Sequence, residues 1–349
     1  MAGRAGPLLV KLDAVGFNSG HEIYASSSLG DFGSRWRGPG YPSPFLRPLE
    51  ALRMTVAAAP SVQTTAAVIV SYQPDSEFDA HLQLLLSEFD AVFLVDNTGA
   101  GAGHIVTHPR LHFHSNDINQ GLGVALNQGC QLALDAGYEW VVTLDQDSRL
   151  EVDFVPMMIA AWSRSSVCPV LLGCNYFSVS RGLHKITADS AAAPIPVATV
   201  ITSGTLMHLD SWRSLGGFRE EFFIDGIDHE ICLRARNAGC LVALYPGSMM
   251  RHSIGEEYDS GSWLGGMRPY RHSPLRDYTN ARNTTRLLLE YVLREPRWCL
   301  RRSLGFAAEL LAVLVFETNK LRRLKCLVFG IGHGIAGKMD DFPEFVRDG

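Results

Sequence analysis

The sequence lacks an apolar run long enough to cross a bilayer as a helix. Its longest run, Leu304 to Phe316, contains Glu309 and is shorter than the roughly 20 residues that a membrane-spanning helix needs. The N-terminus also lacks the apolar core, roughly 7–15 residues long, of a secretory signal peptide. We therefore expect neither a membrane span nor an export signal, and we interpret the run as a buried or interfacial helix.

Excess positive charge and paired cysteines are also missing. The 349 residues include 31 Lys and Arg against 36 Asp and Glu, which argues against binding of nucleic acid through bulk positive charge. The seven cysteines form no CxxC pair, so we expect reduced, buried thiols. A dinucleotide-binding GxGxxG motif is absent too, because Gly121 and Gly123 are followed by Leu126 where the third glycine would stand.

Composition divides the chain into three parts. Residues 1–62 are rich in Gly, Pro and Ser and show no sustained periodicity, so we expect a poorly ordered N-terminal extension. Residues 63–272 alternate apolar runs with helical patterns and form the expected catalytic domain. Residues 273–349 are expected to form a helical C-terminal region, for which contact with a membrane surface is one of two interpretations given below.

The middle part has the pattern of an α/β fold. Apolar runs predict strands at 66–72, 91–97, 111–114, 140–144, 198–209 and 241–245, and amphipathic spacing predicts helices at 76–89, 120–136 and 226–238. Such alternation is typical of a mostly parallel sheet flanked by helices, in which ligands bind beyond the carboxyl ends of the strands. Asp96, Asp145 and Asp147 all fall at such ends.

Asp145-Gln146-Asp147 directly follows a predicted buried strand. Two carboxylates at this spacing can bind a hard divalent cation such as Mg²⁺ or Mn²⁺, which would neutralise a diphosphate. A DxD sequence is also common in solvated turns. The buried strand before it and the motifs after it favour the metal-binding interpretation.

Further acids, Asp225, Asp228 and Glu230, surround the start of the helix predicted at 226–238. N-terminal capping is the simplest interpretation of Asp225, but it does not explain three acids after so apolar a segment. One of them is a candidate general base for a hydroxyl group. His252 follows the last predicted strand; a lone histidine is more often structural, but imidazole can join carboxylates as a metal ligand.

Taken in order, these motifs resemble glycosyltransferase family 2, enzymes of the GT-A fold for nucleotide-diphospho-sugar transferases. The likeness is greatest to bacterial rhamnosyltransferases of surface polysaccharide and O-antigen synthesis. It covers about residues 65–340 and rests on the segments Val68–Tyr72, Val95–Asn97, Asn119–Gly129, Leu144–Ser148 and Phe223–Glu230, and on His252.

The resemblance implies a role for each matching residue. Donor-binding residues would be Ser71, Tyr72, Asp96, Asn119, Gly121 and Asp145. The ligands of Mg²⁺ or Mn²⁺ would be Asp145, Asp147 and His252, and the catalytic base would be Asp228. Residues that orient the substrate or acceptor would be Glu230, Arg234 and Arg282.

The implied reaction is the inverting, metal-dependent transfer of L-rhamnose from dTDP-L-rhamnose to a lipid-linked or growing polysaccharide. One alternative is the same fold with another donor, such as a UDP-sugar. Another is a catalytically silent scaffold protein that binds a nucleotide sugar. The full set of Asp145, Asp147, Asp228 and His252 argues against the silent protein.

The C-terminal part carries the positive charge that the whole chain lacks. Residues 271–325 contain twelve Lys and Arg but five Asp and Glu, interleaved with apolar residues. These are either solvated helix faces or a surface for an anionic membrane and a lipid-diphosphate acceptor. On the second interpretation the protein lies in the cytoplasm, peripheral on the inner face of the cytoplasmic membrane. A homo-oligomer is compatible with the sequence.

Overall fold

A computed structural model of the chain describes residues 58–99, 107–178, 183–252, 273–316, 320–339 and 342–347. The expected N-terminal extension lies outside these residues except for 58–62, and so does the segment 253–272.

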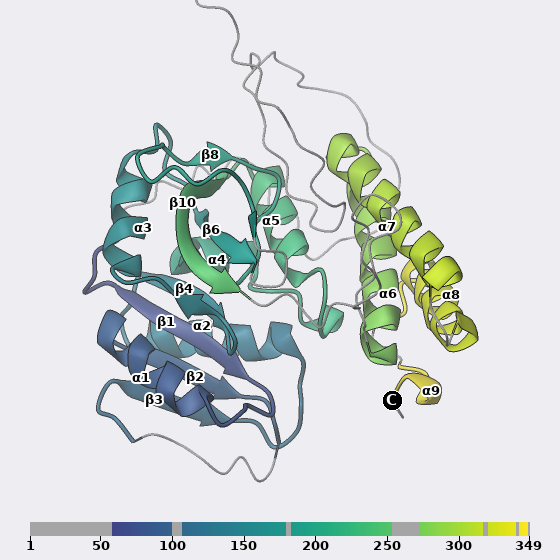
Figure 1. Ribbon diagram of the computed structural model, residues 1–349, viewed down its shortest axis with the longest axis horizontal. Coiled ribbons are helices and arrows are strands. Elements are labelled where there is room, and N and C mark those ends of the chain that lie inside the picture. The colour runs from purple at the N-terminus through teal and green to yellow at the C-terminus, as the bar shows by residue number, and fades with distance from the viewer. Residues whose placement is uncertain are drawn as a thin grey trace, which may run out of the picture.

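Four parallel strands form one half of the sheet, in the order β3-β2-β1-β4 (Figure 1). They are β1 (Thr65–Ser71), β2 (Val92–Asp96), β3 (Leu111–Ser115) and β4 (Trp140–Asp145). Helix α1 (Phe78–Glu88) packs on the face that includes Ile69, and α2 (Leu122–Asp135) on the face that includes Val68. Because both faces are covered, β1 and β2 are apolar at almost every position.

The second half of the sheet is mixed and continues in the order β4-β9-β6-β10-β5. The strands are β5 (Arg149–Leu150), β6 (Leu171–Ser178), β7 (Leu183–His184), β8 (Ile195–Pro196), β9 (Thr205–His208) and β10 (Val242–His252). Strand β9 runs antiparallel to β4 and β6, whereas β6 and β10 are parallel. Helices here are α3 (Phe154–Ser163), α4 (Leu209–Leu215), the 3-10 turn η1 (Glu220–Phe222) and α5 (Ile227–Asn237). The predicted α/β class, with long parallel strands and flanking helices, is confirmed.

Two predicted strands have other lengths in the structure. The strand expected at 198–209 is confined to β9, because Gly204 turns the chain with a φ of +73° and α4 begins at Leu209. The strand expected at 241–245 continues to residue 252 as β10, through register shifts after Tyr245 and Ser248. These shifts interrupt the regular pattern from which a strand end is predicted.

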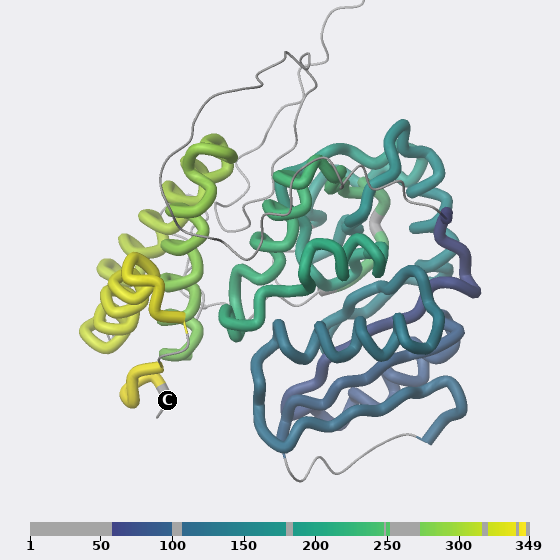
Figure 2. The backbone as a smooth tube through the Cα atoms, turned by 180° about the vertical axis from the view of Figure 1, so that it is seen from behind, coloured from purple at the N-terminus to yellow at the C-terminus, as the bar shows by residue number. Residues whose placement is uncertain are grey.

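The C-terminal region is helical, as predicted. It consists of α6 (Pro274–Tyr291), α7 (Pro296–Phe316), α8 (Lys320–Ala336) and the short α9 (Glu344–Arg347). These helices lie on the side toward which the arrows of β1 and β4 point (Figure 1), and the view from behind shows them beside the sheet domain as well (Figure 2). None of the helices in the described part of the chain combines the length and apolar character required to span a membrane.

Ion pairs join this helical region to the sheet domain. Arg219 binds Glu290 of α6 at 2.7 Å, and Arg236 of α5 binds Glu295, just before α7, at 2.8 Å. Both pairs are largely shielded from solvent, and the loss of one partner would leave a poorly solvated charge. The helical region is therefore fixed against the domain that carries the candidate site.

Candidate active site

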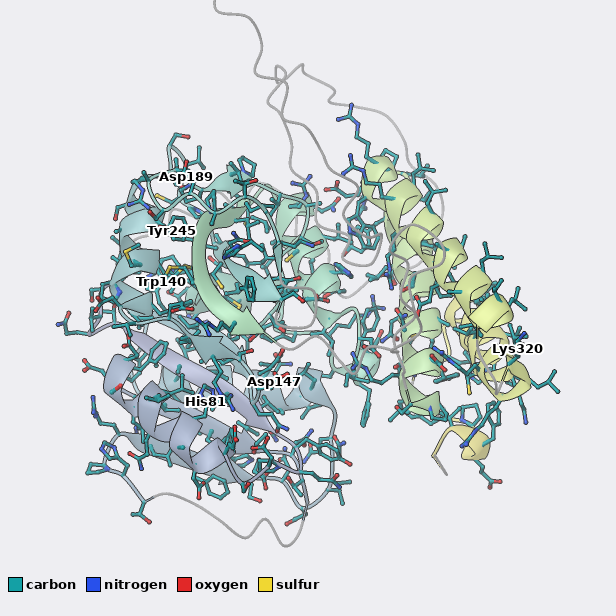
Figure 3. All side chains as sticks on the ribbon, viewed as in Figure 1. His81, Trp140, Asp147, Asp189, Tyr245 and Lys320 are labelled. Carbon is teal, nitrogen blue, oxygen red and sulfur yellow. The ribbon has the colours of Figure 1, made fainter. Side chains whose placement is uncertain are left out.

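The carboxyl ends of three parallel strands bring the predicted donor-binding residues to one edge of the sheet. Ser71 of β1 pairs in register with Asp96 of β2, and Val70 pairs with Asp145 of β4. Figure 3 shows Asp147 just beyond β4, on the side that faces the C-terminal helices. The strand register thus places both acidic motifs at the same edge.

Asp96 is almost fully buried, and its two carboxylate oxygens differ. Oδ1 accepts hydrogen bonds from Ser71 Oγ at 2.9 Å and from Thr98 Oγ1 at 2.7 Å. Oδ2 is buried and has no hydrogen-bond partner within the described residues. An unsatisfied buried carboxylate oxygen is costly, so this atom is suited to accept a hydrogen bond from a ligand.

The segment around Asn119 is fixed by a network of side-chain amides. Asn97 Nδ2 donates to Asn119 Oδ1 at 2.8 Å, and Asn97 Oδ1 accepts from the backbone N–H of Gln120 at 3.0 Å. Gly121 has a φ of +88°, and a Cβ there would lie 2.7 Å from the ring of Phe223. Only glycine fits this position, which joins the amide network to the loop before α5.

The turn at Asp145–Asp147 is held by hydrogen bonds that involve Ser203, Ser148 and Gln146. Ser203 Oγ accepts from the backbone N–H of Asp145 at 3.1 Å and lies 2.5 Å from Ser148 Oγ. Gln146 Oε1 accepts from the backbone N–H of Tyr72 at 2.7 Å, which links the ends of β4 and β1. Asp147 itself is exposed.

The fold also brings the backbone of His252 toward this turn. Strand β5 pairs with β10 in the register Arg149 to Arg251, so the next position places His252 opposite Ser148. The side chain of His252 lies outside the described residues. Among the side chains that are described, no three His, Cys, Asp or Glu form a cluster that could hold a metal. The two carboxylates at 145 and 147 still fit a hard divalent cation, which prefers oxygen ligands.

The three acids around the start of α5 have separate surroundings. Asp225 does not cap α5, whose N-cap is Gly226; its Oδ1 binds Arg276 at 2.7 Å and its Oδ2 accepts from Thr279 Oγ1 at 2.9 Å. The capping interpretation of Asp225 is therefore wrong. Glu230 is buried and binds Arg234 at 2.5 Å. Burial raises the pKa of the Glu230 carboxyl, an effect that Arg234 opposes.

Asp228 is the acid of this group that no ion pair engages within the described residues. It lies in the first turn of α5, is half-buried, and accepts from the backbone N–H of His229 at 2.8 Å. With Thr143 of β4 it lines a small cavity of about 10 Å³. This shared cavity places Asp228 close to the strand that leads into Asp145.

Arg234 and Arg282 make contacts within the protein. Arg234 donates to the backbone carbonyls of Leu215, the last residue of α4, and of Gly217, two residues later. Arg282 is fully buried and donates to the carbonyls of Glu221, Phe222 and Met339. The substrate-orienting role expected of Glu230, Arg234 and Arg282 stays a prediction.

Comparison with known proteins agrees with this arrangement of residues. The family model described as glycosyl transferase family 2 matches residues 90–232, which include Asp96, Asp145, Asp147 and Asp228. The chain carries a glycosyltransferase family 2 domain. The predicted enzyme class, a glycosyltransferase, is confirmed.

This glycosyltransferase is 28% identical over 289 residues to the dTDP-rhamnosyl transferase RfbF of Shigella flexneri, an alignment that covers 78% of the chain and 95% of RfbF. Two crystal structures of S. aureus TarS residues 1–349 are similar in fold. TarS in complex with UDP-GlcNAc superposes with a TM-score of 0.52 at 14% identity, over 79% of this chain and 83% of TarS. The other structure gives 0.50 at 13% identity, over 79% and 82%. The expected GT-A fold of the glycosyltransferase is confirmed.

Proposed function

We propose that this glycosyltransferase transfers L-rhamnose from dTDP-L-rhamnose to a lipid-linked or growing polysaccharide, with inversion at the anomeric carbon. The observation that carries the proposal is the convergence of Asp96, Asp145 and Asp147 on one edge of the sheet. The similarity to RfbF supports the choice of donor.

The nucleotide part of the donor would bind at the ends of β1 and β2. The unpartnered Oδ2 of Asp96 suits the N3–H of a pyrimidine base, with Ser71 and Tyr72 beside it. Asn119 and Gly121 would support the nucleotide and sugar from the other side. Thymine and uracil both carry this N–H, so Asp96 alone does not choose between dTDP and UDP donors, and a UDP-sugar remains the alternative.

The diphosphate part would lie beside Asp145 and Asp147. These carboxylates, with His252 as a further ligand, would hold Mg²⁺ or Mn²⁺. When bound, such an ion supplies positive charge that stabilises a leaving diphosphate. The hydrogen bonds that Ser203, Ser148 and Gln146 form support this role because they fix the turn that presents both carboxylates.

Asp228 would act as the general base. It would accept the proton of the acceptor hydroxyl while the hydroxyl oxygen forms a bond to the anomeric carbon of the sugar. The bond from that carbon to the diphosphate oxygen breaks, and its electron pair leaves with the nucleoside diphosphate. A single displacement of this kind inverts the anomeric centre and needs no carboxylate nucleophile.

The outer surface of α7 and α8, which we call the apolar–basic surface, supports the proposal that the acceptor is anchored in a membrane. Its exposed apolar side chains are Leu300, Leu304, Leu311, Leu314, Val315, Leu321, Val328 and Ile335. Its exposed cations are Arg294, Arg297, Arg301, Lys320, Arg322 and Lys325. Within the described part of residues 292–338 no Asp or Glu is exposed, and Figure 3 shows Lys320 on the outer side of the helices. Such a surface suits a membrane with anionic headgroups.

A donor panel tests the proposal. Purified protein is incubated with dTDP-L-rhamnose, UDP-GlcNAc and other nucleotide sugars, an acceptor extract, and Mg²⁺, Mn²⁺ or EDTA, and the released nucleoside diphosphate is measured. We expect release from dTDP-L-rhamnose that requires acceptor and is abolished by EDTA. Release from a UDP-sugar instead would favour the alternative donor, and binding without any release would favour the silent scaffold protein.

A further inference from the structure

The segment between η1 and α5 has an unfavourable backbone. We call Phe222–Gly226 the base loop, because α5 and Asp228 follow it directly. Phe223, Asp225 and Gly226 have φ angles of +63°, +64° and +78°. Residues with side chains rarely adopt such angles, which persist only where the surroundings enforce them.

Side chains of α6, which is distant in sequence, form hydrogen bonds to the base loop and stabilise this backbone conformation. Asn283 Nδ2 donates to three carbonyls of the base loop, those of Phe222 and Ile224 at 2.9 Å and that of Asp225 at 2.7 Å. Arg282 Nη2 donates to the carbonyls of Glu221 at 3.0 Å and Phe222 at 3.1 Å. Both side chains are fully buried, so their N–H groups need acceptors within the protein, and the carbonyls of Glu221 and the base loop supply them.

The side chain of Asp225, in the base loop, also binds residues of α6. Arg276 and Thr279 bind the two carboxylate oxygens of Asp225. Positions 276, 279 and 283 are separated by three and four residues and therefore share one face of α6. The opposite side of the base loop meets the donor-binding segment, since the carbonyl of Phe223 accepts from the N–H of Leu122 at 2.6 Å.

We infer that Arg282 and Asn283 of α6 are positioning residues that hold the base loop, and through it Asp228, in the geometry needed for transfer. The inference rests on the proposed role of Asp228 as base. It gives Arg282 a role within the protein in place of direct contact with the acceptor. It also makes the helical C-terminal region part of the catalytic unit, because the donors for the base loop come from α6.

If α6 positions the base, loss of its contacts should lower the rate of transfer and leave donor binding unchanged. The donor-binding residues Asp96 and Asp145 lie at the ends of β2 and β4, and their hydrogen bonds with Ser71 and Ser203 do not involve α6. A displaced base can cost about 100-fold in rate for a shift of roughly 1 Å. Loss of the α6 contacts should therefore slow transfer while donor affinity is retained.

The test uses full-length variants. Asn283→Leu keeps the side-chain volume but removes the three donated hydrogen bonds, and Thr279→Val removes one bond to Asp225 without changing the shape. The matched control is Glu295→Gln, which weakens the ion pair with Arg236 at the other end of α5 and leaves the base loop untouched. Hydrogen–deuterium exchange of residues 221–231, donor Kd by calorimetry and the single-turnover transfer rate are measured for each.

For Asn283→Leu we expect faster exchange in the base loop, a transfer rate lower by about tenfold or more, and a donor Kd within about threefold of wild type. Thr279→Val should show the same pattern to a smaller degree and decides the question if Asn283→Leu does not fold. Glu295→Gln should keep the wild-type rate. A wild-type transfer rate in both α6 variants, a loss fully explained by donor Kd, or an equal loss in Glu295→Gln would overturn the inference.

Exchange needs no substrate, so it separates this inference from the proposed function. A wild-type protein inactive with every donor would contradict the proposed function, and unchanged exchange in Asn283→Leu would contradict the positioning of the base loop.

Discussion

Ser71 Oγ donates a hydrogen bond of 2.9 Å to Asp96 Oδ1 and so joins the carboxyl ends of β1 and β2. Ser71 and Thr98 both bind Oδ1, whereas Oδ2 is buried and has no partner in the described part of the chain. The two neighbours hold the carboxylate in the orientation that a base N–H would need. Donor affinity should therefore depend on Asp96 more than on any other residue of these two strands.

Replacement of Asp96 by Asn tests this arrangement. The amide can still accept from Ser71, but its NH₂ group then faces the ligand N–H. Loss of a buried bond to a charged acceptor costs about 1.5–3 kcal/mol, so we expect donor Kd to rise by roughly 10–150-fold. Calorimetry measures the change, with the exposed acid variant Asp210→Asn as control. A Kd within threefold of wild type would show that Asp96 does not contact the base.

His81 predicts an acid-sensitive stability. Its ring is buried, and neither nitrogen has a hydrogen-bond partner among the residues that the structure describes. Burial, more than the nearby Arg149, lowers its pKa from 6.5 to about 4. The folded protein thus favours neutral His81, so its contribution is complete above pH 6.5 and is lost as pH falls toward 4. The loss by pH 4.5 is on the order of 2–3 kcal/mol.

Urea unfolding at pH 7 and pH 4.5 measures this loss. His81→Leu has no proton to bind and should lose less stability on acidification than wild type. The exposed-site variant His112→Gln should behave as wild type. An identical loss in His81→Leu and wild type would assign the acid sensitivity to other groups.

Two glycines of α8 should respond to alanine with opposite signs. A Cβ at Gly330 would lie 2.5 Å from the backbone carbonyl of Tyr278, so Gly330→Ala must push α8 away from α6 and should destabilise by about 1–3 kcal/mol. A Cβ at Gly332 meets no described atom within 4 Å, so Gly332→Ala should stabilise the helix by about 0.5–1 kcal/mol. Thermal unfolding compares the two. Shifts of the same sign would contradict the observed packing of α8 on α6.

The apolar–basic surface predicts binding to anionic membranes. Flotation with phosphatidylglycerol vesicles at low salt should recover the protein, and phosphatidylcholine vesicles or high salt should recover less, since each basic residue contributes about 1 kcal/mol. Leu304→Ser with Leu311→Ser should weaken binding, because both exposed side chains would enter the interface. Leu84→Ser on α1, 63% exposed, is the matched control. Equal recovery of all variants without vesicle preference would refute membrane contact.

The parallel half of the fold could be predicted because its strands are buried on both faces and form unbroken apolar runs. Strand β6 could not, since Gly173 and Asn175 interrupt its pattern. Asn175 is buried because its amide donates to the carbonyls of Ile186 and Pro246, contacts formed only in the tertiary structure. The strand expected at 198–209 is longer than β9, because the apolar pattern does not reveal the turn at Gly204.

The donor-binding edge could be predicted because residues at strand ends meet wherever parallel strands are in register. The hydrogen bonds from α6 to the base loop could not be predicted, because Asn283 and its carbonyl partners are about 60 residues apart in sequence. For the same reason the sequence indicates a helix cap at Asp225, although Arg276 and Thr279 bind its carboxylate in the structure.

The central claim, that Asp228 is the base of an inverting transferase, is tested most directly by Asp228→Asn. The amide keeps the size of the side chain but cannot accept the proton, so the transfer rate from dTDP-L-rhamnose should fall by about 100-fold or more. Donor Kd, measured on the same protein by calorimetry, should stay within about threefold. The reason is that Asp228 lies on α5, whereas the proposed donor-binding acids Asp96 and Asp145 lie at the ends of β2 and β4. A near-normal transfer rate in Asp228→Asn would contradict the account.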